Sequence, residues 1–173
     1  MRRRILYVLA LPLMLAGLVW AASPALAVSP HFVGASAQTS GANLVVSFHE
    51  SGLGTNQLID FTANADATAT FVCVNNGGKN PSAANKTTVS GPVSASGSFS
   101  SGKNGNINQS LTLTPPGPPS PSDFSCPPGQ TGPTLAQVSY TNVSITDTTN
   151  HITEPIPGTF SACALPNVRG ACS

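Results

Sequence analysis

His49 and Glu50 are adjacent in the sequence, and a histidine beside a carboxylate can supply the general base of a hydrolase. They follow a segment in which apolar and more polar residues alternate, as in a β-strand. Neighbouring strand residues point to opposite faces, so the pair can act together only if the strand breaks at the Ser-Gly-Leu-Gly of 51–54. His31 and His151 stand alone, and the sequence contains neither Gly-x-Ser-x-Gly nor His-Glu-x-x-His. A small secreted hydrolase that uses His49 or His151 with a nearby carboxylate therefore stays the alternative hypothesis.

The loop Asn-Gly-Gly-Lys at 76–79 resembles part of a phosphate-binding loop. Such a loop needs Gly, four residues and then Gly-Lys-Ser/Thr before a long helix. Here Asn80 follows Lys79, and Cys73 occupies the position of the first glycine. Asn80 could cap one helical turn that begins at Pro81. We predict a turn with one capped helical turn rather than a phosphate site.

No motif for a metal or another cofactor is present, and we expect none. The calcium-loop pattern Asp-x-Asp-x-Asp does not occur. The stretch Asp-Thr-Thr-Asn at 147–150 is more typical of a polar turn than of a calcium site.

The chain has four cysteines, Cys73, Cys126, Cys163 and Cys172. An even number in an exported chain predicts two disulfides, for which three pairings are possible. The short span between Cys163 and Cys172 is typical of a local loop, which would leave Cys73 to pair with Cys126. The other two pairings stay open. No Cys-x-x-Cys occurs, so a redox or zinc role has little support.

Residues 1–27 have the pattern of a secretory signal peptide. Three arginines at 2–4 precede an apolar stretch, and Ala-Leu-Ala at 25–27 places small residues at a cleavage site after Ala27. An uncleaved membrane anchor is the alternative, because the apolar stretch is nearly long enough to span a bilayer. We therefore predict a secreted, extracellular protein that starts at Val28 and has no membrane association after cleavage.

The charge of the mature chain argues against nucleic acid as a partner. Seven Lys and Arg occur in the whole chain, and removal of the three signal arginines leaves four against six Asp and Glu. No basic patch or run of like charges is present.

Alternating patterns predict an all-β fold with seven to nine strands. The longest runs from Ile59 to Cys73, with apolar residues at the odd positions, and exceeds the usual strand length of about ten residues. We expect it to bend across the edge of two sheets rather than to turn at 64–66. Other alternating segments are 43–48, 93–100, 107–113 and 136–145, the last with a one-residue shift near Asn142 that indicates a bulge. Between 93–100 and 107–113, the composition of 101–106 predicts a hairpin loop.

These strands, with Gly, Asn and Pro turns between them, predict an antiparallel β-sandwich, immunoglobulin-like or similar and braced by disulfides. Edge strands are expected near Phe32 and within 152–160, where prolines fit only an edge. The mature chain, 28–173, suits one domain. It includes a stiff Pro-rich loop at 114–133 and a C-terminal disulfide tail at 161–173.

Three stretches, 44–86, 124–150 and 157–160, resemble a group of small exported bacterial proteins without an assigned activity. The resemblance implies export and a β-rich domain, and it implies no catalytic residue. Cys73 and Cys126 lie inside these stretches, whereas Cys163 and Cys172 lie after them. The resemblance therefore supports pairing within each set.

The composition points to a non-enzymatic extracellular or cell-envelope domain that binds an extracellular or cell-wall partner, which the sequence does not identify. The mature surface is rich in Ser, Thr and Asn and weakly charged. Sugar-binding sandwiches commonly use exposed Trp or Tyr, but Trp20 leaves with the signal and Tyr140 lies in an apolar pattern. We expect no aromatic sugar platform.

Overall fold

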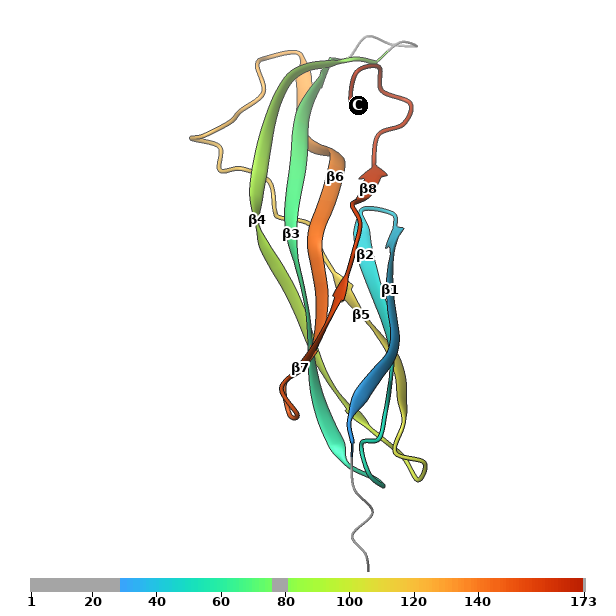
Figure 1. Ribbon diagram of the computed structural model, residues 1–173. Coiled ribbons are helices and arrows are strands. Elements are labelled where there is room, and N and C mark those ends of the chain that lie inside the picture. The colour runs from blue at the N-terminus through green and yellow to red at the C-terminus, as the bar shows by residue number, and fades with distance from the viewer. Residues whose placement is uncertain (1–28, 76–80, 173) are drawn as a thin grey trace, which may run out of the picture.

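The computed structural model describes residues 29–75 and 81–172, and these residues form an all-β structure (Figure 1). The predicted signal peptide and the Gly78-Lys79 loop lie outside the described residues. In chain order the strands are β1 (His31–Ser40), β2 (Asn43–Ser51), β3 (Leu58–Asn75), β4 (Ala83–Ser100), β5 (Ile107–Leu113), β6 (Gln130–Asp147), β7 (Ile152–Ile156) and β8 (Phe160–Cys163).

The strands form two antiparallel sheets, which confirms the predicted sandwich. The small sheet has the order β1-β2-β5. The large sheet has the order β4-β3-β6-β7, and β8 pairs with β6 beyond the end of β7. The inner faces of the sheets are apolar and pack on each other, as the alternating patterns require.

β3 is 18 residues long and keeps its period-two burial from Leu58 to Phe71, but it does not bend from one sheet into the other, so that expectation was wrong. It stays in the large sheet because it has partners of equal length on both sides. β4 and β6 are also 18 residues long, and both pair with β3 over most of its length.

The predicted hairpin at 101–106 was also wrong. β4 pairs with β3 and β5 pairs with β2, so this loop crosses between the sheets. The loop is held by the 53–57 segment instead: the Leu53 N–H donates to the Gly105 carbonyl at 3.0 Å, and the Asn56 N–H donates to the Gly102 carbonyl. The buried Ser101 hydroxyl donates to the Gly54 carbonyl at 2.7 Å.

No helical turn begins at Pro81, in contrast to the prediction; β4 begins at Ala83 and is ten residues longer at its start than the pattern suggested. Backbone bonds explain the extended conformation: the Ala83 N–H donates to the Arg169 carbonyl at 3.0 Å, and the Arg169 N–H donates to the Pro81 carbonyl at 3.1 Å. The C-terminal tail thus supplies partners that the local sequence does not reveal.

The bulge predicted near Asn142 is confirmed. The register between β3 and β6 shifts between Asn64 and Asp66, and Asn142 has a φ of 53°. The edge strands are confirmed as well: β1 borders the small sheet, and β7 and β8 border the large sheet with Pro155 in β7. The predicted Pro-rich loop ends earlier than expected, because β6 already begins at Gln130.

The main core lies between the two sheets. Ala63, Ala65 and Ala67 of β3 are buried in it, and such small side chains leave room for the larger ones that face them. Rings of Phe48 and Phe61 meet across the sandwich with centroids 4.6 Å apart. Burial raises the pKa of Tyr140 to about 12, and its hydroxyl donates to the Ala42 carbonyl at 2.7 Å, which ties β6 to the β1–β2 turn.

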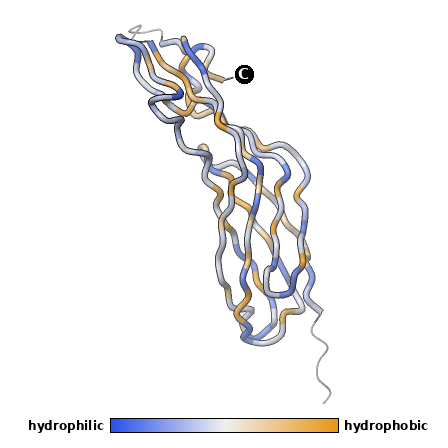
Figure 2. The backbone as a smooth tube through the Cα atoms, turned by 90° about the vertical axis from the view of Figure 1, so that its left-hand side faces the viewer, coloured by the Kyte–Doolittle hydropathy of each residue, from blue (hydrophilic) through white to orange (hydrophobic). Residues whose placement is uncertain are grey.

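A second, smaller core lies beyond the small sheet, where β3, β4 and β6 continue beside the C-terminal tail (Figures 1 and 2). We call this end the distal lobe. It contains buried Val72, Ala136 and Ala171. Val72 is out of phase with the odd-numbered core residues of β3, and its burial is explained by Ala171 of the C-terminal tail.

Both disulfides belong to this distal part, and the favoured pairing is confirmed. Cys73 is bonded to Cys126, and Cys163 is bonded to Cys172. The first bond joins β3 to the Pro-rich loop. The second closes the C-terminal tail, which also pairs with the lobe through the Ala164 N–H, a donor to the Ala136 carbonyl at 2.7 Å.

Candidate functional site

His49 and Glu50 lie on opposite faces of the small sheet. β2 continues through both residues to Ser51, so the break that would bring them together does not occur. His49 is half-buried on the outer face, whereas Glu50 is fully buried on the inner face. The structure therefore does not bring this sequence pair together.

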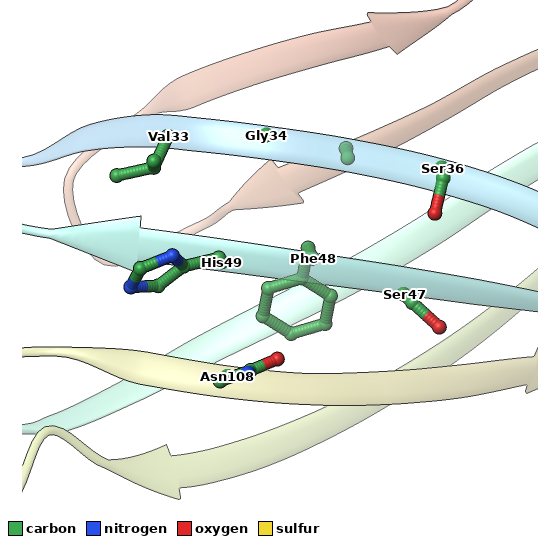
Figure 3. A pocket seen from close by; sticks show the side chains of 8 residues that line it. Val33, Gly34, Ser36, Ser47, Phe48, His49 and Asn108 are labelled. Atoms are coloured by element: carbon green, nitrogen blue, oxygen red, sulfur yellow. The ribbon is translucent and has the colours of Figure 1, made fainter.

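A shallow hollow of about 390 Å³ lies beside His49 on the outer face of the small sheet (Figure 3). Gly34 pairs with His49 across the strands and contributes no side chain, while Val33 is the extra residue of a β-bulge. The bulge and the glycine together make the depression. Val33, Ser36, Ser47, His49 and Asn108 surround it.

This hollow has hydrogen-bonding groups but lacks the arrangement of a catalytic site. None of the residues that line it is a carboxylate. No hydrogen bond of the described residues involves the His49 side chain, so nothing fixes its tautomer. The geometry suits weak binding of a small polar group.

The other histidines lie elsewhere. His151 is exposed in the turn between β6 and β7 and has a φ of 59°. His31 is exposed at the start of β1, where its Nδ1 lies 2.9 Å from the Ser29 carbonyl oxygen. The structure brings neither of them into the hollow beside His49. Among the described residues, no three His, Cys, Asp or Glu side chains gather as metal ligands.

The outer face of the large sheet carries an extended array of polar side chains, which we call the hydroxyl face. Neighbouring strands of a sheet are about 4.8 Å apart, and alternate residues along a strand about 6.8 Å. Because β3 and β4 stay in register from Leu58 to Cys73, the part of the array on these two strands is regular in both directions. Its members are Asp60, Thr62, Asn64, Asp66, Thr68 and Thr70 of β3, Ser90, Ser94, Ser96 and Ser98 of β4, and Ser139 and Thr141 of β6.

Cross-strand hydrogen bonds order the hydroxyl face. Thr62 and Ser96 hydroxyls lie 2.9 Å apart, and those of Thr68 and Ser90 lie 3.0 Å apart. Both acidic residues are also held by neighbours: Ser98 donates to Asp60, and the Asn142 side chain donates to Asp66. A hydroxyl can donate one bond and accept two, so each pair keeps free capacity for a ligand.

A buried pair of carboxyl groups lies between the sheets, near the ends of β2 and β6. Glu50 and Asp147 are both 0% exposed. Asp147 accepts bonds from the Thr149 and Asn150 backbone N–H groups, each at 2.8 Å, and from the Asn150 side-chain amide at 2.6 Å. Neither oxygen of Glu50 has a donor among the described residues.

The environment of Glu50 favours its neutral form. Burial, and then the charge of Asp147 and a side-chain hydrogen bond to it, raise the Glu50 pKa from 4.5 to about 8. A hydrogen bond between two carboxyl groups requires a proton on one of them, so a protonated Glu50 would gain in Asp147 the partner that its oxygens otherwise lack. The polar turn predicted at 147–150 also holds Asp147 in place, because its Thr149 and Asn150 groups donate hydrogen bonds to the Asp147 carboxyl group.

Sequence reasoning missed this pair, although a signal was present. Glu50 continues the even-numbered core positions 44, 46 and 48 of β2, and Asp147 continues the odd-numbered positions 143 and 145 of β6. A carboxylate in phase with a core pattern is unusual, because such residues are rarely buried without a partner. That the two meet could not be read from the pattern, because they lie on different sheets.

Comparisons with protein-family models, with proteins of curated function and with solved structures gave no match to this chain. The resemblance to exported bacterial proteins therefore stays a prediction. Within the described ranges, no helix is long and apolar enough to cross a membrane. Two disulfides fit an oxidising compartment such as the extracellular space.

Proposed function

We propose that this protein is a secreted, non-enzymatic binding or surface module, and that its hydroxyl face contacts a polar polymer of the cell wall. The observation that carries the proposal is the ordered array on β3, β4 and β6. Rows of hydroxyl and amide groups suit a partner that offers repeated hydrogen-bonding groups along its length.

The composition of the face agrees with a neutral, hydroxyl-rich partner such as a polysaccharide. Its two carboxylates, Asp60 and Asp66, accept bonds from Ser98 and Asn142 and keep further lone pairs, so they too can accept hydrogen bonds from the hydroxyl groups of such a partner. None of its members is aromatic, so recognition would depend on hydrogen bonds rather than on stacking against rings.

Secretion is part of the proposal and has its own test. The signal pattern at 1–27 predicts that the exported chain starts at Val28. Intact-mass measurement of protein from the culture medium should give that start, and a chain that retains Met1 would contradict it.

Binding can be tested by co-sedimentation of the mature protein with isolated cell wall. The variant Thr68→Arg/Ser94→Arg places two long charged side chains at exposed positions of the hydroxyl face. We expect it to lose at least about tenfold in affinity, which corresponds to about 1.4 kcal/mol.

The matched control, Gln38→Arg/Ser110→Arg, makes the same kind of change at exposed positions of the small sheet, and it should bind like the wild type. Both variants should first be shown to melt like the wild type. Equal binding by the two variants would contradict the role of the hydroxyl face. Release of soluble wall fragments that disappears with His49→Ala or His151→Ala would instead favour a hydrolase.

A further inference from the structure

The two buried carboxyl groups come from opposite sheets and lie beside one aromatic contact: the rings of Phe32 and Phe61, their cross-strand neighbours, have centroids 6.4 Å apart. Glu50 stands on the inner face of β2, between Phe32 of β1 and Ile107 of β5, with which it pairs across the strands. Asp147 stands on the inner face of β6 and pairs with Phe61 of β3. The site therefore spans the sandwich and is surrounded mainly by apolar side chains.

Few other ionisable groups surround Glu50. The titratable residue of β1 nearest to it is the exposed His31, and β5 has no charged residue. Asp60 lies on the outer face of β3. Glu154 of β7 shares the inner side with Asp147 and is partly exposed. His151 in the turn after Asp147 and Lys103 in the loop before β5 are both exposed, and neither forms an ion pair with Glu50 or Asp147 among the described residues.

The hydrogen bonds indicate which carboxyl group of the pair is ionised and which carries the proton. Asp147 accepts three N–H bonds from the turn that follows it, an arrangement suited to a carboxylate. Glu50 has no N–H or O–H donor among the described residues. A proton on Glu50 allows it to donate to Asp147, which satisfies both groups with one negative charge.

We propose that Glu50 and Asp147 share a single proton and form a pH-sensitive clasp that holds the two sheets together at this end of the sandwich. The proposal is independent of the hydroxyl face and of the ligand. Loss of the proton places two like charges in a buried site, and this end of the sandwich then loosens.

The direction of the pH effect follows from the proton that the folded state retains. Unfolded Glu50 releases its proton near pH 4.5, whereas folded Glu50 retains it up to about pH 8. The stabilisation of the folded state by this proton is complete below pH 4.5 and is lost as the pH rises through about 8. Over that range, the unfolding equilibrium constant should rise on the order of a thousand-fold from this group.

Denaturant unfolding of the disulfide-bonded protein from pH 5 to pH 9.5 tests the clasp. In Glu50→Gln the neutral amide replaces the protonated carboxyl, so most of the alkaline loss of stability should disappear. Glu154→Gln is the control, because it removes a carboxylate from the same side of the large sheet and should retain the wild-type pH dependence. The proposal would be overturned if Glu50→Gln kept the full pH dependence of stability. It would also be overturned if Glu50→Gln and Glu154→Gln lost that pH dependence to the same extent.

A second measurement does not require any variant to fold. The Glu50 side-chain carboxyl carbon of the isotope-labelled wild type should titrate in NMR near pH 8. The protection factors of the Leu53 and Thr149 amides, which are corrected for the intrinsic rise of exchange with pH, should fall through the same range. Titration of Glu50 near its ordinary value, or protection factors that do not change with its titration, would refute the clasp.

Discussion

The disulfide between Cys73 and Cys126 should stabilise the protein more than the disulfide of the tail. Cys73 is fully buried at the distal end of β3, and Cys126 lies in the Pro-rich loop. All backbone hydrogen bonds within that loop are local among the described residues, such as Asp123 and Phe124 to the Ser120 carbonyl. The disulfide is therefore the main connection between the middle of the loop and the sheet.

The contribution of each disulfide to the free energy of unfolding can be estimated from the length of the loop that it closes. The Cys73–Cys126 bond spans 53 residues, and the Cys163–Cys172 bond spans 9 residues. The chain-entropy model gives about 4 kcal/mol for the first and about 2.6 kcal/mol for the second. For a chain of this size, 1 kcal/mol corresponds to roughly 2–4 °C of melting temperature.

Thermal unfolding followed by circular dichroism can compare the two double alanine variants. Cys73→Ala/Cys126→Ala should melt about 8–16 °C below the wild type, and Cys163→Ala/Cys172→Ala about 5–10 °C below it. Hydrogen exchange should show that the first variant opens at Val72 and Ala136, the distal core, before the main core. A tail variant that is equally or more destabilised would refute the reasoning.

Two single substitutions give further predictions. Tyr140→Phe removes the hydroxyl that donates to the Ala42 carbonyl, and it should lower the free energy of unfolding by about 1 kcal/mol in urea titration; an unchanged midpoint would show that the bond does not contribute. Gly52→Ala should cost roughly 2–4 kcal/mol, because Gly52 has a φ of 78° and a Cβ there would collide with the Ser29 carbonyl. Gly102→Ala, with a φ of 61° but open space, is its control and should cost only about 1 kcal/mol, so equal costs would exclude the collision.

The parts of the fold that depend on local pattern could be predicted from the sequence. Alternation identified the inner face of β3 and the bulge at Asn142, because period two directly reports which side of a strand is buried. The disulfide pairing was favoured by the short span between Cys163 and Cys172. The alternation and the short cysteine span both involve residues that are close together in the sequence.

The features that the sequence did not predict correctly depend on contacts between residues that are far apart in the sequence. The loop at 101–106 has the composition of a hairpin, yet its bonds to the 53–57 segment direct the chain into the other sheet. β4 begins early because Arg169 of the tail pairs with its start. Glu50 and Asp147 belong to different sheets, so neither their pairing nor its effect on the Glu50 pKa is visible in the sequence.

The most direct test of the proposed function is to map where the partner binds. Soluble fragments of cell-wall polysaccharide can be titrated into the isotope-labelled mature protein while backbone amide shifts are recorded by NMR. The account predicts saturable changes that cluster on the hydroxyl face, around Thr62, Thr68 and Ser139. Changes that cluster instead around His49 and Val33 in the hollow of the small sheet, or no changes at saturating fragment concentration, would contradict it.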